Sequence, residues 1–232
     1  MLSYQFKPNT TSTAIYDFRL SARDISGNSR TGTLNSTYTY HDNPVRFKSP
    51  YWFSSSTGAL TGTVGHMTMP TSVVSQANGA VEVVYQTGSD VASSQSVVEM
   101  IGSGPSTRAC EMLIYNSRSY LLVNNNVQSI FNTGLVLTAN TRYYCAVTWD
   151  STAGTTSLWI GKINDDNSLS VTQVGSNLTI SPDFSALNIV RTIQSNNSLS
   201  NFTGKISWIR FSSGTKTSFP TEDVNVYQIT GA

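Results

Sequence analysis

The stretch NTRYYCAVTWDSTAGTTSLWIGKI, residues 140–163, carries the clearest fold signal in this chain. In its first half apolar side chains recur at every second position, which is the side-chain period of a β-strand. They are Tyr143, Cys145, Val147 and Trp149, with Tyr144, Ala146 and Thr148 on the opposite face. Small residues break the pattern at 151–155, and SLWIGKI then resumes it, with Leu158 and Ile160 opposite Trp159. The stretch therefore predicts two strands joined by a tight turn.

Similar short apolar runs recur along the whole chain, separated by turn residues. Strands are expected over residues 14–20, 81–85, 97–101, 110–115, 120–123, 128–131, 169–174, 187–193, 204–211 and 224–229. No helical periodicity stands out, which excludes α/β folds and predicts an all-β antiparallel sandwich or barrel with almost no helix. We see neither an internal repeat nor a linker. We expect an N-terminal arm or edge strand over residues 1–13 and one jelly-roll β-sandwich domain over residues 14–232.

The composition narrows the classes of partner. The formal net charge of the 232-residue chain is +1 and only 12% of its residues are charged, whereas nucleic-acid binders need clustered Lys and Arg. We therefore expect no nucleic-acid partner. No apolar run reaches the roughly 18 residues of a membrane span, so no membrane insertion is expected. The start, MLSYQFKPNTT, lacks the apolar core of a secretory signal. We expect a whole natural chain without a signal peptide.

Two cysteines, Cys110 and Cys145, are the only ones in the chain. Each falls in phase with the apolar positions of a predicted strand, which favours two buried free thiols, with a disulfide as the alternative. Two cysteines do not form a structural zinc site.

Four stretches resemble, in the same order, the laminin-G-like jelly roll of the concanavalin A-like lectin/glucanase superfamily. They are Tyr16-Asp17-Phe18 with the Asp24-Ile25-Ser26-Gly27-Asn28 turn and Gly32-Thr33-Leu34; Val45-Arg46-Phe47; residues 140–150 with Leu158-Trp159-Ile160-Gly161; and residues 202–210. The resemblance implies a concanavalin A-like sandwich. The superfamily includes lectins, adhesion modules, glycoside hydrolases, polysaccharide lyases and viral surface proteins, so fold does not settle function.

Glycoside hydrolysis needs two carboxylates facing each other across a cleft. The hydrolases of the superfamily carry a Glu-x-Asp-x-x-Glu or similar spacing, and this chain has none. Glu82 is expected to face solvent. Glu99 and Glu111 are expected as a pair on neighbouring strands, facing a concave sheet. We expect no enzyme; a divergent polysaccharide hydrolase or lyase built on that pair is the third hypothesis.

Two candidate binding sites lie in expected loops. Sugar binding needs an exposed aromatic platform beside hydrogen-bonding groups, and the best loop set is Tyr38, Tyr40, His41, Tyr51 and Trp52. The alternative is that Trp52 or Phe53 packs into the core where the chain enters the sandwich. Calcium prefers carboxylate and amide oxygens. The best local cluster is Asp165, Asp166 and Asn167, with Asp150 and Asp90 as other loop carboxylates; the alternative is that these residues only make turns. No other cofactor is implied.

These features lead to two non-enzymatic hypotheses. The first is a surface interaction module of a virus or bacteriophage particle, such as a capsid decoration, fibre or receptor-binding protein. It would be assembled in the host cytoplasm, would contact other virion proteins, and would form homo-oligomers through the arm of residues 1–13. The alternative is an extracellular carbohydrate-binding, lectin-like adhesion module, calcium-assisted, that binds a host-surface glycan.

Overall fold

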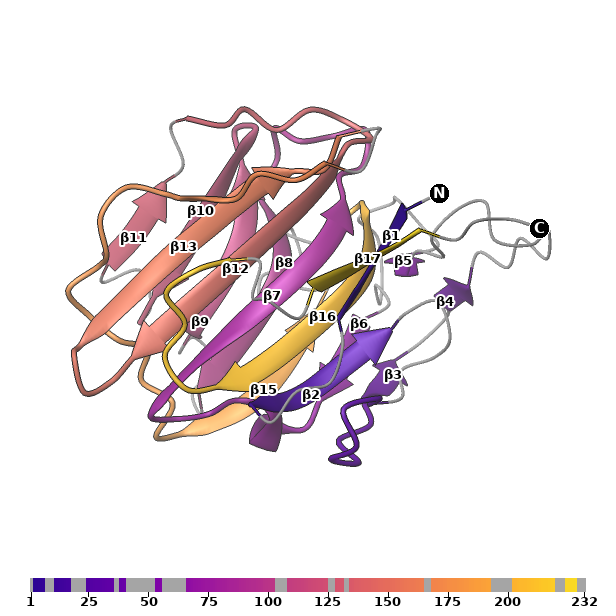
Figure 1. Ribbon diagram of the computed structural model, residues 1–232. Coiled ribbons are helices and arrows are strands. Elements are labelled where there is room, and N and C mark those ends of the chain that lie inside the picture. The colour runs from indigo at the N-terminus through magenta and orange to yellow at the C-terminus, as the bar shows by residue number, and fades with distance from the viewer. Residues whose placement is uncertain are drawn as a thin grey trace.

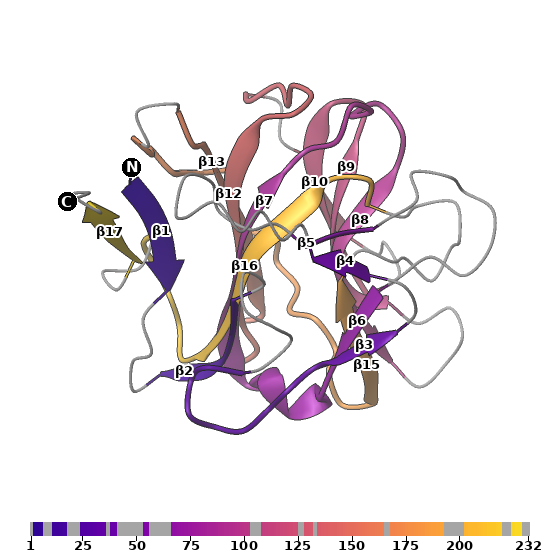
Figure 2. The same cartoon turned by 90° about the vertical axis from the view of Figure 1, so that its right-hand side faces the viewer.

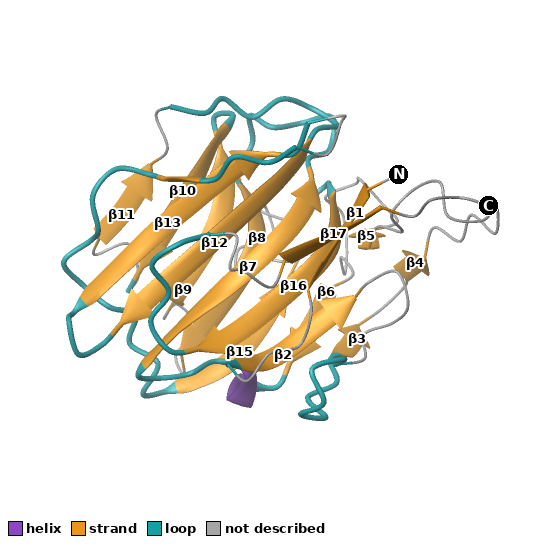
Figure 3. Ribbon diagram, viewed as in Figure 1, coloured by secondary structure: helices purple, strands orange, loops and turns teal. Residues whose placement is uncertain are grey.

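Two stacked antiparallel sheets make up the body of the molecule, as Figure 1 and Figure 3 show. The computed structural model describes residues 2–6, 11–17, 24–35, 38–40, 53–55, 66–102, 108–124, 128–131, 134–164, 168–192, 202–219 and 224–228. Every strand pair in these ranges is antiparallel. The predicted all-β sandwich is thereby confirmed. Within the same ranges the only helix is one 3-10 turn, Thr71–Val73, and no helix is long enough to cross a membrane.

The smaller sheet has seven strands in the order β11-β10-β9-β8-β15-β6-β3. Their bounds are β3 Thr33–Asn35, β6 His66–Met69, β8 Gln95–Gly102, β9 Arg108–Tyr115, β10 Arg118–Val123, β11 Gln128–Phe131 and β15 Leu187–Thr192.

The larger sheet has eight strands, in the order β14-β13-β12-β7-β16-β5-β4 with β2 also paired to β16. Their bounds are β2 Ser12–Asp17, β4 Tyr38–Tyr40, β5 Phe53–Ser55, β7 Asn78–Gln86, β12 Arg142–Asp150, β13 Thr155–Lys162, β14 Thr172–Gln173 and β16 Lys205–Ser213. The predicted hairpin of residues 140–163 is β12–β13, one residue pair of which is Cys145 with Ile160.

The two chain ends meet in a separate two-stranded ribbon. β1 Leu2–Phe6 pairs with β17 Val224–Gln228. Figure 2 shows the ribbon on the side of the larger sheet that faces away from the smaller sheet, and β1 contacts β16 there. Part of the expected N-terminal arm is therefore a strand held by the C-terminal end of the same chain.

Between the sheets lies the main apolar core, because alternate residues of each strand point inward. The predicted inward face of β12 is confirmed: Tyr143, Cys145, Val147 and Trp149 are all buried in this core. Leu158 and Ile160 of β13 join them, and β9 of the opposite sheet supplies Cys110 and Met112. Both cysteines are buried free thiols, so the disulfide alternative is wrong. Burial raises the pKa of Cys110 to about 12.

Glu82 corrects one sequence-based expectation. It points to the outer face of the larger sheet, as its phase predicted, but it is 0% exposed. That face carries a second apolar cluster, in which Tyr144 and Trp208 from the strands pack with Phe219 from beyond β16. Arg210 of β16 is directly opposite Glu82 and donates to Glu82 Oε2 from Nε at 2.7 Å. Around Glu82 the outer face is therefore a second buried layer, and the Glu82 charge is paired inside it.

The turn at Asp24 forms as predicted. Asp24 Oδ1 accepts hydrogen bonds from the backbone N–H of Ile15 and Ser26, and Oδ2 accepts one from the N–H of Arg30. Gly27 takes a φ of +92°, a conformation that glycine adopts without the cost a side chain would add. The carboxylate thus ties β2 to the following loop.

Candidate functional site

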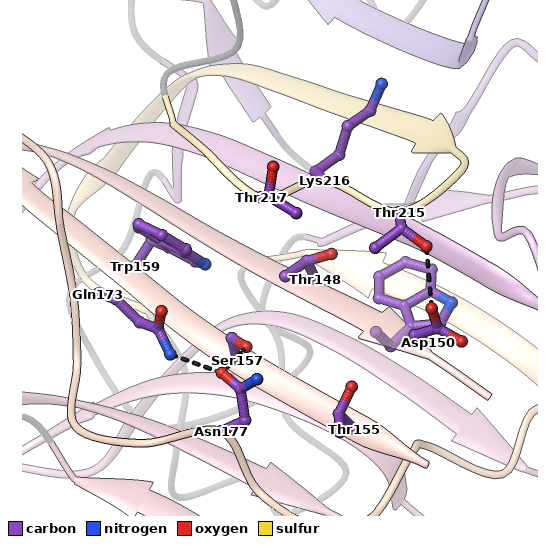
Figure 4. Close-up of a pocket in the computed structure, with 11 residues that line it drawn as sticks. Thr148, Asp150, Thr155, Ser157, Trp159, Gln173, Asn177, Thr215, Lys216 and Thr217 are labelled. Atoms are coloured by element: carbon purple, nitrogen blue, oxygen red, sulfur yellow. Dashed lines mark hydrogen bonds between the residues drawn. The ribbon is translucent and has the colours of Figure 1, made fainter. Parts of the chain in front are cut away.

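A hollow of about 150 Å³ opens on the outer face of the larger sheet. Its lining comes from the hairpin β12–β13, from β14 and the loop that follows it, and from residues 215–217 after β16. Figure 4 shows these side chains gathered around one opening, with Trp159 at one end and Asp150 at the other. Two neighbouring segments and one from much later in the chain thus build one site.

Trp159 is the aromatic member of the site. The alternation of β13 sends Leu158 and Ile160 into the main core and Trp159 to the outer face. There its ring packs on Phe219, with the ring centroids 5.3 Å apart. The indole Nε1 is buried and has no hydrogen-bond partner among the described residues. A buried donor without a partner costs free energy, and since this nitrogen is closed to solvent, only a ligand that displaces its neighbours would relieve that cost.

The floor of the hollow is a network of hydroxyl and amide groups. Asn177 Oδ1 accepts two hydrogen bonds, both of 2.6 Å, from Ser157 Oγ and from Gln173 Nε2. These bonds fix the orientation of the Asn177 amide, which is exposed at the surface. Thr148 Oγ1 donates to the Gly79 carbonyl oxygen at 3.1 Å. The polar groups are therefore held in place before any ligand arrives.

Asp150 closes the other end of the hollow. Its Oδ1 accepts the backbone N–H of Thr152 and Ala153, both at 2.9 Å, and its Oδ2 accepts Thr215 Oγ1 at 3.0 Å. The Ala153 hydrogen bond, followed by that of Thr215, lowers the pKa of Asp150 below its usual range. The carboxylate is therefore charged at neutral pH and serves the β12–β13 turn.

Lys216, also in the lining, donates from Nζ to Thr11 Oγ1 at 2.8 Å. Figure 4 shows the Lys216 side chain pointing away from Trp159 and Asn177, so its ammonium group does not face the centre of the hollow. Among the described residues that line the hollow, Asp150 is the only carboxylate, so they do not offer the two facing carboxylates that glycoside hydrolysis uses. Its groups are suited to hydrogen bonding and stacking.

Glu99 and Glu111 form the expected pair on neighbouring strands. They are directly opposite each other across β8 and β9, and Arg191 of β15 is opposite Glu99 on its other side. Arg191 donates to Glu99 Oε2 from Nε at 3.0 Å and from Nη2 at 2.8 Å. Both carboxylates are almost fully buried. A buried carboxylate that is paired with arginine is a structural ion pair.

Loop carboxylates beyond the hollow make turns. Asp90 Oδ1 accepts the backbone N–H of Ala92 at 2.8 Å and of Ser93 at 3.1 Å, the same arrangement as at Asp150. For these two residues the turn interpretation is confirmed. In the ranges with described structure, no three side chains of His, Cys, Asp or Glu gather as metal ligands would. The predicted calcium cluster of Asp165, Asp166 and Asn167 lies outside those ranges and stays a prediction.

The predicted sugar site also stays a prediction. The backbone of Tyr38 and Tyr40 belongs to β4, while His41, Tyr51 and Trp52 lie outside the described residues. Sequence reasoning placed Trp159 in a strand and missed the hollow. The available signal was its phase: Trp159 shares the outer face with polar Thr148 and Ser157, unlike Trp149, which is in the core.

Comparisons with known proteins bear on the fold. No family model matches the chain, and no curated protein matches it in sequence. Among solved structures, domain 4 of AbnA, a GH43 extracellular arabinanase from Geobacillus stearothermophilus, in complex with arabinotriose, is similar with a TM-score of 0.59 and 13% identity. That match covers 89% of this chain and 94% of the domain.

Botulinum neurotoxin binding domains are similar as well. The domain of serotype mosaic C/D matches with a TM-score of 0.55 and 13% identity over 89% of this chain, and that of neurotoxin DC, in complex with rat synaptotagmin II, with 0.57 and 10% over 94%. This chain spans about half the length of those toxin domains, 48% in each case. The likeness extends over nearly the whole chain, and it shows that the chain shares the β-sandwich fold of these domains.

Proposed function

We propose that this chain is a non-catalytic carbohydrate-binding module that takes a neutral sugar in the hollow beside Trp159. The observation that carries the proposal is the combination of the Trp159 ring in the lining of the hollow with a floor of fixed hydroxyl and amide groups. Sugars are recognised by an aromatic ring for their apolar face and by hydrogen bonds for their hydroxyls. The Asp150 carboxylate in the lining favours a neutral ring over an acidic one, because it would repel an acidic sugar.

The fold neighbours support the same class of function. One of them is a structure of an arabinanase domain in complex with arabinotriose, and the match covers 94% of that domain. Others are the toxin binding domains, one of them in complex with synaptotagmin II. A rigid sandwich that presents a ligand hollow is the arrangement we propose here. The virion role and the location at a particle surface are separate proposals; they rest on the composition and stay predictions.

An array of neutral and acidic glycans, probed with and without a calcium chelator, tests the proposal. We expect neutral glycans to bind, and binding to survive the chelator. Loss of binding with chelator would instead favour the predicted cluster of Asp165, Asp166 and Asn167. Absence of binding to every neutral glycan would overturn the proposal.

Variants then locate the site by calorimetry with the best neutral glycan from the array. Trp159→Phe keeps a ring against Phe219 but reduces the aromatic surface that lines the hollow, and Asn177→Ala removes the exposed amide. Each should weaken binding about fivefold to tenfold, the effect of a reduced stacking surface or of one lost hydrogen bond. Ser72→Ala, which removes an exposed hydroxyl from the 3-10 turn, is the matched control. Unchanged affinity in both site variants, with a loss in Trp52→Ala, would move the site to the predicted aromatic set.

A further inference from the structure

The smaller sheet has an outer face that the proposed sugar site does not use. On β9, Met112 and Ile114 point into the main core, so Glu111, Leu113 and Tyr115 point outward. On β10, Leu121 and Val123 point inward, so Tyr120 and Leu122 point outward. The register places Tyr120 opposite Leu113 and Leu122 opposite Glu111. The hairpin β9–β10 therefore presents one continuous strip of side chains on the side of the sandwich opposite Trp159.

A second hollow, of about 240 Å³, lies over this strip. Tyr115 and Tyr120 form its aromatic wall, with ring centroids 5.8 Å apart and the rings 62° from parallel. Tyr115 is 43% exposed, one of two large apolar side chains in the described chain that reach this exposure. Leu113 and Leu122 supply an apolar floor. A partly exposed aromatic ring that its neighbour holds edge-to-face is a preformed stacking surface.

The other end of the hollow is polar. Arg108, whose side chain is 29% exposed, lies 3.3 Å from Glu111 Oε2 through Nη1 and 3.3 Å from Glu99 Oε1 through Nε. Glu99 is held in turn by Arg191. Two arginines and two glutamates balance in charge, and their interactions fix the Arg108 guanidinium at the edge of the hollow. Ser94 adds a hydroxyl to the lining.

We propose that this hollow is a second carbohydrate site, in which a sugar ring stacks on Tyr115 and its hydroxyls bond to the Arg108–Glu111 pair and to Ser94. A sugar ring matches this lining because it has one apolar face and a polar rim, and a neutral ring matches the balanced charges. The inference rests on the proposed function and extends it: one chain would hold two glycan segments, on opposite faces of the sandwich, and would link glycan chains without forming an oligomer.

NMR titration of the ¹⁵N-labelled full chain tests the two sites separately. The probes are arabinotriose, cellotriose and maltotriose, each added to millimolar concentration. We expect at least one of them to shift the Trp159 indole N–H and, as a second set, the amides of Ser94 and of residues 115–120. In Tyr115→Ala the second set should lose about tenfold in affinity, the effect of one lost stacking contact, while the Trp159 signal responds as before. Val136→Ala, at a side chain that is 51% exposed, is the matched control.

Each outcome decides between the two sites. A probe that shifts Trp159 but no amide near Tyr115 overturns the second site and leaves the proposed function standing. Shifts near Tyr115 without any at Trp159 support the second site and overturn the first. Shifts at neither site with all three probes overturn both. An affinity in Tyr115→Ala equal to that of the parent protein removes the stacking role, and Arg108→Gln then shows whether the polar end binds at all.

Discussion

Arg210 and Glu82 are two charged residues that are buried together as an ion pair. Both side chains are 0% exposed, with Arg210 Nη2 2.6 Å from Glu82 Oε2, and the Tyr144 hydroxyl donates to Glu82 Oε1 at 2.5 Å. Removing one partner of such a pair leaves an uncompensated buried charge, which costs far more than removing both. The three residues lie on the adjacent strands β16, β7 and β12, so their pairing also fixes the register of the larger sheet.

We predict that Arg210→Met lowers the free energy of unfolding by about 3–5 kcal/mol, because the Glu82 carboxylate remains buried without its cation. The double variant Glu82→Leu/Arg210→Met should recover most of that loss. Urea unfolding followed by tryptophan fluorescence measures both. A double variant that is less stable than Arg210→Met would show that the pair contributes stability of its own.

The lowered pKa of Asp24 makes the stability of the fold depend on pH. Burial alone would raise its pKa, but the backbone hydrogen bonds from Ile15, Arg30 and Ser26 outweigh burial and lower it. A carboxyl whose folded pKa is depressed stabilises the fold above its unfolded pKa of about 3.9. That stability is lost as the pH falls through the lower, folded pKa.

We therefore expect Asp24→Asn to cost about 1–2 kcal/mol at pH 7, since the amide keeps one acceptor and loses the charge. The difference from the parent protein should shrink below about pH 4. Thermal unfolding from pH 3 to pH 7 measures it. A difference that is constant over this range would mean that the carboxylate charge contributes nothing at this turn.

At the scale of elements, β13 and residues 169–170 lie close together because Gly161 has no side chain between them. A Cβ added there would lie 2.4 Å from the Ser170 carbonyl oxygen and 2.7 Å from Leu169 Cδ1. Two backbones can approach this closely only where one residue is glycine. The close approach positions β14, and with it Gln173 at the edge of the Trp159 hollow.

We predict that Gly161→Ala costs about 1–3 kcal/mol through this clash and weakens binding in the Trp159 hollow without changing any group that lines it. Gly154→Ala is the control, because its φ is +63° and nothing lies within 4 Å of an added Cβ; the left-handed backbone alone should cost about 1 kcal/mol. Chemical unfolding and the side-chain amide signals of Gln173 and Asn177 measure the two effects. Equal behaviour of both variants would refute the close-packing argument.

For the whole molecule, the two thiols report on whether the sandwich opens. Cys110 belongs to the smaller sheet and Cys145 to the larger, and both face the core between them. Burial raises the pKa of both thiols, so each is protonated as well as inaccessible at neutral pH, and only the thiolate reacts readily.

We expect neither thiol to react with a maleimide reagent in the native protein at pH 7, and both to become labelled together as urea separates the sheets. Mass spectrometry of peptides resolves the two sites. Rapid labelling of one thiol in the folded protein would show that the sheets open independently. Absence of labelling in urea without reductant would show a disulfide, against the structure.

The sequence alone determined the class of the fold and which side chains of each central strand face the core. The reason is that the alternation of side chains is local and is set by the pleat of a single strand. Tyr143, Cys145, Trp149 and Leu158 are buried where their phase placed them. Tertiary structure decided what covers each face. Phase sent Glu82 outward, but only the second apolar layer made that position buried.

The same reason explains why the two hollows could not be found beforehand. The Trp159 hollow needs residues from β12 and β13, the loop after β14 and the loop after β16, and no local pattern relates segments that far apart in sequence. The Glu99–Glu111 pairing was predicted, since it needs only two neighbouring strands. Arg191 comes from β15, 92 residues from Glu99, and long-range strand order alone brings it there.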